Sequence, residues 1–177
     1  DRIDEVINTK SSITDAESPK SISNPKGLLV FDHVNFKYPG ANENALEDIN
    51  FVAEPGKTTA IIGSTGCGKS TLVNLIPRLY DATEGSITLD GENIKNISMK
   101  ELRDELGYVP QKGILFSGTI ESNIKFGAPE ASMDIVKEAA EIAQATEFIE
   151  TKSAKYESPI AQGGTNVSGG QKQRVAI

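Results

Sequence analysis

The chain has 177 residues, enough for one domain with its own hydrophobic core, and 37% of them are hydrophobic. Its formal net charge of −7 argues against nucleic-acid binding, and no segment approaches the roughly 18 consecutive apolar residues that a membrane-spanning helix needs. A single cysteine cannot form an internal disulfide, which fits a reducing compartment.

The first 27 residues predict a helix and a linker. Ile3, Val6 and Ile7 fit one face of a helix, so the chain begins like the end of a longer helix. Residues 9–27 are rich in Ser, Thr, Asp, Lys and Pro and carry only isolated apolar residues, which is typical of a linker. We therefore expect the domain itself to begin at residue 28.

The sequence predicts three β-strands after the linker. Residues 28–38 and 49–53 each predict a β-strand, and the single histidine, His33, is expected on the surface of the first. Residues 58–62 form a β-branched, apolar run that predicts a buried strand.

The most specific motif comes next, over residues 63–70. It reads Gly-Ser-Thr-Gly-Cys-Gly-Lys-Ser and matches G-x-x-x-x-G-K-[ST] in full. Apolar residues at 72, 75, 76 and 79 then have helical spacing, so the motif lies between a strand and a helix. Such a loop binds phosphate through backbone N–H groups and a helix N-terminus. Lys69 is expected to reach the β- and γ-phosphates, and Ser70 to bind Mg²⁺.

Beyond the loop, the chain predicts a β-hairpin, a short helix and then a helical region. Residues 86–91 alternate and end in Asp-Gly, a hairpin signal, and Ser98 to Glu101 form a capping box. Residues 107–111 predict a short strand, and residues 117–157 an all-helical region. The apolar residues expected on the buried face of its main helix are Ile135, Ala139, Ile142 and Ala143.

A second glycine cluster lies near the end of the chain, and with it the chain resembles the nucleotide-binding domain of ABC transporters. Val167-Ser168-Gly169-Gly170-Gln171 is similar to that family's signature motif. Tyr38 matches its adenine-stacking aromatic residue, and Gln111 matches the glutamine that binds Mg²⁺ and orients water. The resemblance covers residues 28–177. Within the family, the chain looks most like the exporters of the multidrug or lipid type.

The resemblance implies an α/β fold. It consists of a P-loop NTPase core, an antiparallel β subdomain and an inserted helical subdomain at about 117–157. The core is expected to be incomplete, because the family's second acidic Mg²⁺ motif, general base and switch histidine should lie after Ile177. One departure is Gln162, where exporters often carry a glutamate.

The resemblance also assigns roles to individual residues. Catalytic roles fall to Lys69, Gln111, Ser168 and Gly170, and Mg²⁺ binding falls to Ser70 and Gln111. The residues expected to bind ATP are Tyr38, Gly63, Ser64, Thr65, Gly66, Cys67, Gly68, Lys69, Ser70, Thr71, Gln111, Ser168, Gly169, Gly170 and Gln171.

The implied partners are a transmembrane domain on the same polypeptide, contacted through residues 112–130, and a second nucleotide-binding domain, identical or not. The implied location is the cytoplasmic face of the cell membrane, within an integral membrane protein. The parent is expected to couple ATP binding and hydrolysis to export, whereas these 177 residues alone are expected to be inactive. The alternatives are a regulatory half with a degenerate catalytic site and a soluble ABC-type ATPase, which the acidic charge disfavours.

Overall fold

The computed structural model describes residues 2–177, which form two compact units, one running to Gly107 and the other spanning Tyr108–Ile177. Each unit has a separate hydrophobic core.

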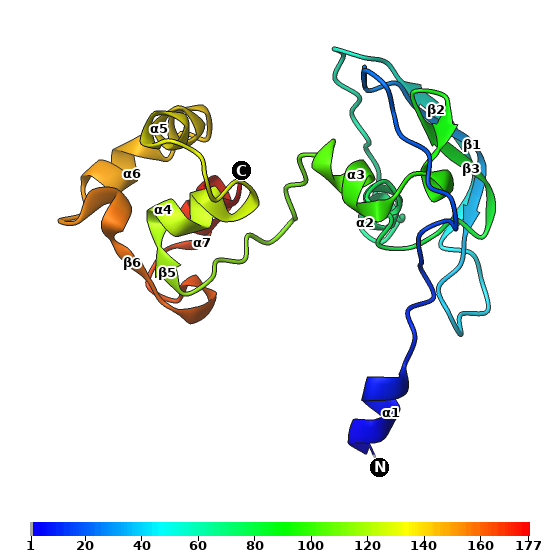
Figure 1. Ribbon diagram of the computed structural model, residues 1–177, viewed down its shortest axis with the longest axis horizontal. Helices are drawn as coiled ribbons and strands as arrows, with labels where there is room; N and C mark the ends of the chain where they lie inside the picture. Colours follow the sequence, from blue (N-terminus) through cyan, green and yellow to red (C-terminus); the bar gives the residue numbers. More distant parts are fainter. Residues whose placement is uncertain (1) are drawn as a thin grey trace. The chain divides into compact units, whose positions relative to one another are not determined.

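The first unit is built on a four-stranded antiparallel sheet with the strand order β2-β1-β3-β4 (Figure 1). Its elements in chain order are α1 (Arg2–Asn8), β1 (Leu29–Phe36), β2 (Leu46–Ala53), α2 (Lys69–Leu75), β3 (Glu84–Leu89), β4 (Glu92–Asn93), the 3₁₀ turn η1 (Ile94–Asn96) and α3 (Met99–Asp104). The predicted antiparallel subdomain is therefore confirmed, as are the Asp-Gly hairpin between β3 and β4 and the helix that begins after Ser98.

Alternation along the strands builds the core of this unit. Phe31 of β1 pairs with Phe51 of β2 and Ile87 of β3, and the Phe31 and Phe51 rings stack with centroids 4.5 Å apart. Buried leucines of α2 (Leu72 and Leu75) and α3 (Leu102) belong to the same apolar cluster. Burial of these side chains fixes both helices to the sheet, since apolar burial is the main stabilising term.

His33 lies on the surface of β1, as expected. Its side chain is exposed, and its Nδ1 lies 2.6 Å from Oδ1 of Asp48 on β2. This hydrogen bond, and then the charge of Asp48, raise the pKa of His33. His33 and Asp48 both have positive φ and lie where the β1–β2 register shifts, so they mark a bulge.

The buried strand predicted at residues 58–62 is wrong: the segment is irregular and exposed, with Ile62 at 91%. The strand predicted at 107–111 is absent too, because residues 106–110 have no regular structure. Extended segments need hydrogen-bonded neighbours, and the described pairings place no strand beside either segment. Apolar composition without a partner strand does not make a strand.

The second unit is mainly helical (Figure 1). The all-helical region predicted at residues 117–157 is wrong at Gly118–Thr119, which form a two-residue strand paired with Pro159–Ile160. The elements of this unit are β5 (Gly118–Thr119), α4 (Ile120–Ile124), η2 (Lys125–Gly127), α5 (Met133–Ile142), α6 (Thr146–Glu150), η3 (Lys155–Glu157), β6 (Pro159–Ile160), η4 (Gln162–Gly164) and α7 (Gly169–Ala176). Its core contains Ile120, Val136, Phe148, Ile149 and Val175.

The predicted buried face of α5 is mostly wrong. Ile135 and Ile142 are 56% and 73% exposed. The buried side is instead Val136, Ala140 and Ala143, which share one face at spacings of four and three residues. The helix carries apolar residues on two faces, and only the packing partners determine which face is buried.

None of the helices in residues 2–177 has both the length and the apolar character needed to cross a bilayer.

Candidate nucleotide-binding site

The phosphate loop leads directly into α2, as the sequence predicts. Lys69 is the first residue of α2, and its ammonium turns back into the loop. There its Nζ donates to the carbonyls of Gly63 (2.9 Å) and Ser64 (2.7 Å) and lies 3.5 Å from Sγ of Cys67. Residues 63–67 are exposed. The loop therefore presents a cation and a helix N-terminus on an open surface, which is a favourable arrangement for binding anions.

Gly68 makes this geometry possible. It has φ of 89°, and it precedes α2 without any side-chain cap. A Cβ at this position would lie 2.8 Å from Cδ2 of Leu46 and 2.9 Å from the carbonyl oxygen of Ala45. Only glycine combines the left-handed backbone with this close approach to β2. The first N–H groups of α2 consequently remain available to a ligand.

Tyr38 lies two residues after β1 and contacts the first turn of α2. Its hydroxyl is 2.9 Å from Oγ1 of Thr71, which is buried on α2. Its ring packs edge-on against Phe36 and Tyr80, with centroids 4.8 and 5.2 Å away. The structure thus brings the expected adenine-stacking ring to the helix that begins with Lys69.

Sequence reasoning missed Tyr80, which belongs to this aromatic cluster. The signal was present, because Tyr80 comes five residues after the end of α2 and is the only aromatic residue between the loop and β3. The alcohol of Thr71 was expected at the nucleotide, but in this structure it bonds to Tyr38.

The remaining predicted site residues belong to the second unit. Gln111 lies at an exposed bend between the end of α3 and β5. Two residues later, Gly113 approaches α7 so closely that a Cβ would lie 2.8 Å from the carbonyl oxygen of Lys172. Because of this contact, the segment after Gln111 is fixed against the helix that carries the second glycine cluster.

The second glycine cluster also begins a helix. Ser168 precedes α7, and its Oγ accepts from the N–H of Gln171 (3.3 Å), while Oε1 of Gln171 accepts from the N–H of Ser168 (3.0 Å). Gly169 and Gly170 are exposed, and a Cβ on either would meet nothing within 4 Å. Two N–H groups of this helix start are therefore satisfied by the chain itself, and the two glycines between Ser168 and Gln171 are exposed.

Three side-chain hydrogen bonds hold the loop before α7. The side chain of Asn166 accepts from the N–H of Ala161 (3.0 Å) and donates to the carbonyl of Pro159 (2.7 Å). Nζ of Lys172 donates to the carbonyl of Gly163 (2.9 Å). Gln162, in the same loop, is exposed.

Two residues with oxygen donors were expected to bind Mg²⁺, one in each unit. Ser70 is exposed on the first turn of α2, and Gln111 is exposed in the second unit. Among the described residues, no group of three or more His, Cys, Asp or Glu side chains is placed to hold a metal. Mg²⁺ at nucleotides typically uses one or two protein oxygens together with phosphates and water, so such a cluster is not required.

Residues 112–130, expected to face a transmembrane partner, carry an exposed aromatic pair. Phe116 and Phe126 stack with centroids 4.5 Å apart and are 52% and 66% exposed. Both rings and Ile114 line a cavity of about 350 Å³ within the second unit. An open apolar surface of this kind is typical of a protein interface.

Comparisons with known proteins identify the family. A model of the ABC transporter family matches residues 46–177. The uncharacterized ABC transporter ATP-binding protein YfiB of Bacillus subtilis is 44% identical, over 100% of the chain and 30% of its own length. A Staphylococcus aureus protein, provisionally named a multidrug export ATP-binding/permease protein, is 42% identical over 98% of the chain and 30% of its own length.

A solved structure of a bacterial Atm1-family ABC exporter with ATP bound matches 99% of the chain and 31% of its own, at a TM-score of 0.93 and 35% identity. The chain thus spans about 30% of the length of these relatives. The match confirms the expected fold class, an α/β nucleotide-binding domain with an antiparallel subdomain and a helical subdomain. On the family model and the relatives together, the chain belongs to the ABC transporter family.

Proposed function

We propose that the chain binds ATP with Mg²⁺ at the phosphate loop. One observation carries the proposal: the ammonium of Lys69 lies within an exposed loop of backbone groups at the start of α2. A triphosphate entering the loop would exchange the carbonyl partners of Lys69 for β- and γ-phosphate oxygens. Such charge-assisted bonds are stronger than bonds to neutral carbonyls.

The other proposed roles follow from position. Ser70 supplies a hydroxyl to Mg²⁺, and the N–H groups of residues 63–71 bind phosphate oxygens. Tyr38 stacks on adenine, with its hydroxyl bonded to Thr71 so that base and phosphate subsites share one helix. Mg²⁺, when bound, neutralises charge that develops on the phosphates.

Hydrolysis requires a second domain in this proposal. Gly169 and Gly170 at the start of α7 would bind the γ-phosphate held by a partner, alongside the hydroxyl of Ser168, and each domain would supply half of each site. Gln111 would orient the attacking water and contribute an oxygen to Mg²⁺. In-line attack on the γ-phosphate is then favoured by Lys69 and the partner's glycines.

The parent protein, in this proposal, is an exporter that couples ATP hydrolysis to transport across a membrane. Two comparisons support this. One relative is named as a multidrug export ATP-binding/permease protein, and the matching solved structure is that of an ABC exporter. These names favour an exporter over a soluble ABC-type ATPase. Residues 1–27 would connect a transmembrane region to the domain, and the surface around Phe116 and Phe126 would contact that region.

The binding proposal is tested by titration calorimetry with Mg-ATP on the wild-type chain, Lys69→Ala and Lys172→Ala. Lys172 is the matched control, because it also donates to a glycine carbonyl, at the other glycine cluster. Lys69→Ala should weaken binding about 100-fold, since bonds to charged groups contribute roughly 1.5–3 kcal/mol each. Lys172→Ala should bind like the wild type. Equal affinity of Lys69→Ala and wild type would contradict the proposal.

A further inference from the structure

The segment that reads as a linker is partly docked on the first unit. We call residues 14–28 the strap. Its ends and middle make hydrogen bonds to the turn after α2, to α3 and to the β3–β4 hairpin. Ile22 of the strap also packs against the apolar core. None of these contacts belongs to the nucleotide site itself.

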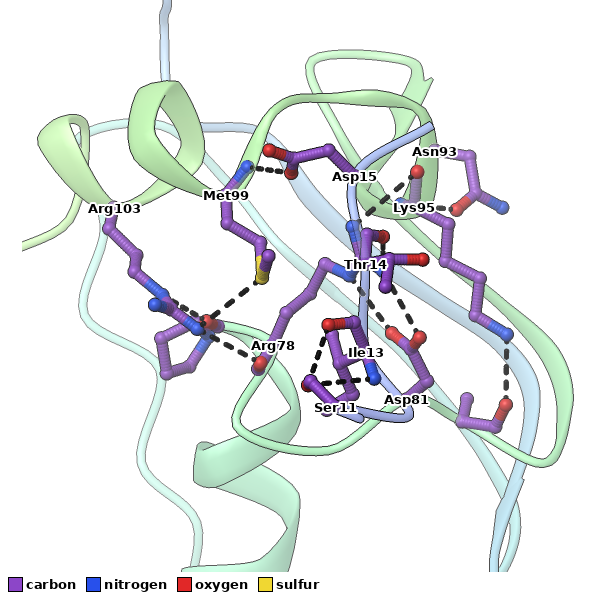
Figure 2. Close-up of polar contacts among 12 residues, drawn as sticks. Ser11, Ile13, Thr14, Asp15, Arg78, Asp81, Asn93, Lys95, Met99 and Arg103 are labelled. Atoms are coloured by element: carbon purple, nitrogen blue, oxygen red, sulfur yellow. Dashed lines mark hydrogen bonds and ion pairs between the residues drawn. The ribbon is translucent and has the colours of Figure 1, made fainter. Parts of the chain in front are cut away.

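A buried arginine holds the first end of the strap. Arg78, three residues after α2, is only 3% exposed. Its guanidinium donates twice to Asp81, at 2.9 and 3.1 Å, and its Nη2 also donates to the carbonyl of Thr14 at 3.3 Å (Figure 2). Its Nη1 donates to the carbonyl of Lys95 at 3.5 Å. A buried guanidinium needs partners for its N–H donors, and the strap carbonyl supplies one of them.

The strap then adds to the N-terminal cap of α3, in which Ser98 accepts from the N–H of Glu101. Oδ1 of Asp15 accepts from the N–H of Met99, the first residue of α3, at 2.7 Å (Figure 2). Glu101, which the sequence placed in a capping box with Ser98, instead turns its carboxylate to the strap. It accepts from the N–H of Ile22 (2.9 Å) and from the hydroxyl of Ser21 (3.1 Å).

Helix α3 in turn holds the chain that follows the phosphate-loop helix. Arg103 of α3 donates to the carbonyls of Pro77 (2.9 Å) and Arg78 (3.2 Å) (Figure 2). A closed ring of contacts results: strap to Arg78, Arg78 to Arg103, and α3 back to the strap at Asp15. Arg78 has φ of 52°, a conformation that persists only where its surroundings fix it.

From this ring we propose that Asp15, Glu101 and Arg78 are positioning residues for the nucleotide site, acting through the docked strap on the C-terminal end of α2. The inference rests on the proposed nucleotide binding at the other end of that helix. Docking of the strap restrains α2, which begins at Lys69, and so strengthens binding of Mg-ATP. By thermodynamic linkage, bound Mg-ATP strengthens docking of the strap by the same factor.

The strap is best released by removing the carboxylates that bond to it or from it, and not by removing Arg78. Arg78→Ala would leave Asp81 unpaired and is expected to unfold the unit, whereas Asp15 is exposed and Glu101 only partly buried. The test variant is therefore Asp15→Ala combined with Glu101→Ala. The control is Asp104→Ala, on the same helix, whose carboxylate bonds to Lys100 one turn away and not to the strap.

Two measurements are made on the 177-residue chain: amide hydrogen exchange at Ile22 and Met99, and the Kd for Mg-ATP by calorimetry. In the wild type and in Asp104→Ala, both amides should be protected, and Mg-ATP should increase the protection. In the double variant the protection should be lost and the Kd should rise about 5-fold, at the lower end of typical coupling between sites.

Three outcomes overturn the inference. Unprotected Ile22 and Met99 amides in the wild type would mean that the strap is not docked. Loss of protection in the double variant with an unchanged Kd would mean that the strap covers the unit without acting on the nucleotide site, and the proposed nucleotide binding would stand. Failure of the wild type and of Asp104→Ala to bind Mg-ATP would overturn the proposed function and the coupling together.

Discussion

Two glycine-rich segments begin helices in this chain, and they begin them differently. The first, at α2, has Gly68 in a left-handed conformation, no side-chain cap and the ammonium of Lys69 inside the loop. The second, at α7, has Ser168 and Gln171 in a reciprocal capping box. Both leave backbone N–H groups at a helix N-terminus, yet the first has no side-chain cap and the second has one.

The difference indicates that the two segments depend on a bound ligand to different extents. A helix start with its own cap is stable without a ligand, because two of its orphan N–H groups are already paired. An uncapped start with a lysine beside it is completed by an anion. We therefore expect the phosphate loop to bind nucleotide in a single chain, and the signature segment to bind it only when a partner presents it.

The largest expected effect is on the free energy of unfolding, when one methyl group is added at the N-terminus of α2 or of α7. Gly68→Ala should destabilise the first unit by about 2 kcal/mol, because it forces a positive φ and a clash with Leu46. Gly169→Ala should be neutral or stabilising by up to about 1 kcal/mol, since its Cβ meets nothing within 4 Å. Urea unfolding measures both. Equal destabilisation by the two substitutions would remove the contrast between the segments.

A smaller effect on stability is expected when a serine hydroxyl is removed at the N-terminus of α7 or of α2. Ser168→Ala should cost the second unit about 1 kcal/mol, since it deletes the acceptor for the N–H of Gln171. Ser70→Ala should change stability by less than about 0.5 kcal/mol. It should instead weaken ATP binding in the presence of Mg²⁺ and not in EDTA. A stability loss from Ser70→Ala as large as that from Ser168→Ala would show that α2 is capped after all.

The strap and the α7 cap should respond differently to low pH. The α7 cap is made of neutral side chains, whereas carboxylates hold the strap. Burial raises the pKa of Asp90, but bonds from the N–H groups of Leu28, Gly27 and Lys26 outweigh it and hold that pKa below its usual range. The ammonium of Lys20, and then the amide of Asn96, lower the pKa of Glu92.

Both folded-state pKa values are lowered, so their stabilisation is present above about pH 4 and is lost as the pH falls through the lowered values. The amide resonances of residues 26–28 should therefore shift in NMR spectra only below about pH 4, while those of residues 168–171 stay unchanged. Asp90→Asn should abolish the shift. A midpoint at or above the ordinary aspartate value would contradict this assignment of the bonds.

The sequence predicted most of the local elements around the site. The full phosphate-loop motif, the Asp-Gly hairpin and the cap before α3 are signals that reside in a few adjacent residues, and each is found in the structure. Residues such as Gly68 and Ser168 determine their own backbone conformation or capping. For such features, local chemistry is sufficient.

What sequence reasoning missed depends on partners distant in the chain. The strand predicted at 58–62 has no neighbouring strand and is irregular. Helix α5 has apolar residues on two faces, and packing buries Val136 and not Ile135. The polar strap resembles a free linker in composition, yet Glu101 binds it across 79 residues of sequence. A single chain gives no sign of such long-range choices.

The most direct test of the contrast is residue-resolved hydrogen exchange on the dilute chain, with and without saturating Mg-ATP. We predict slower exchange for the amides of residues 66–72 on nucleotide addition, and no change for the amides of residues 169–172. Protection at residues 169–172 without protection at residues 66–72 would contradict the account, as would no change in either segment.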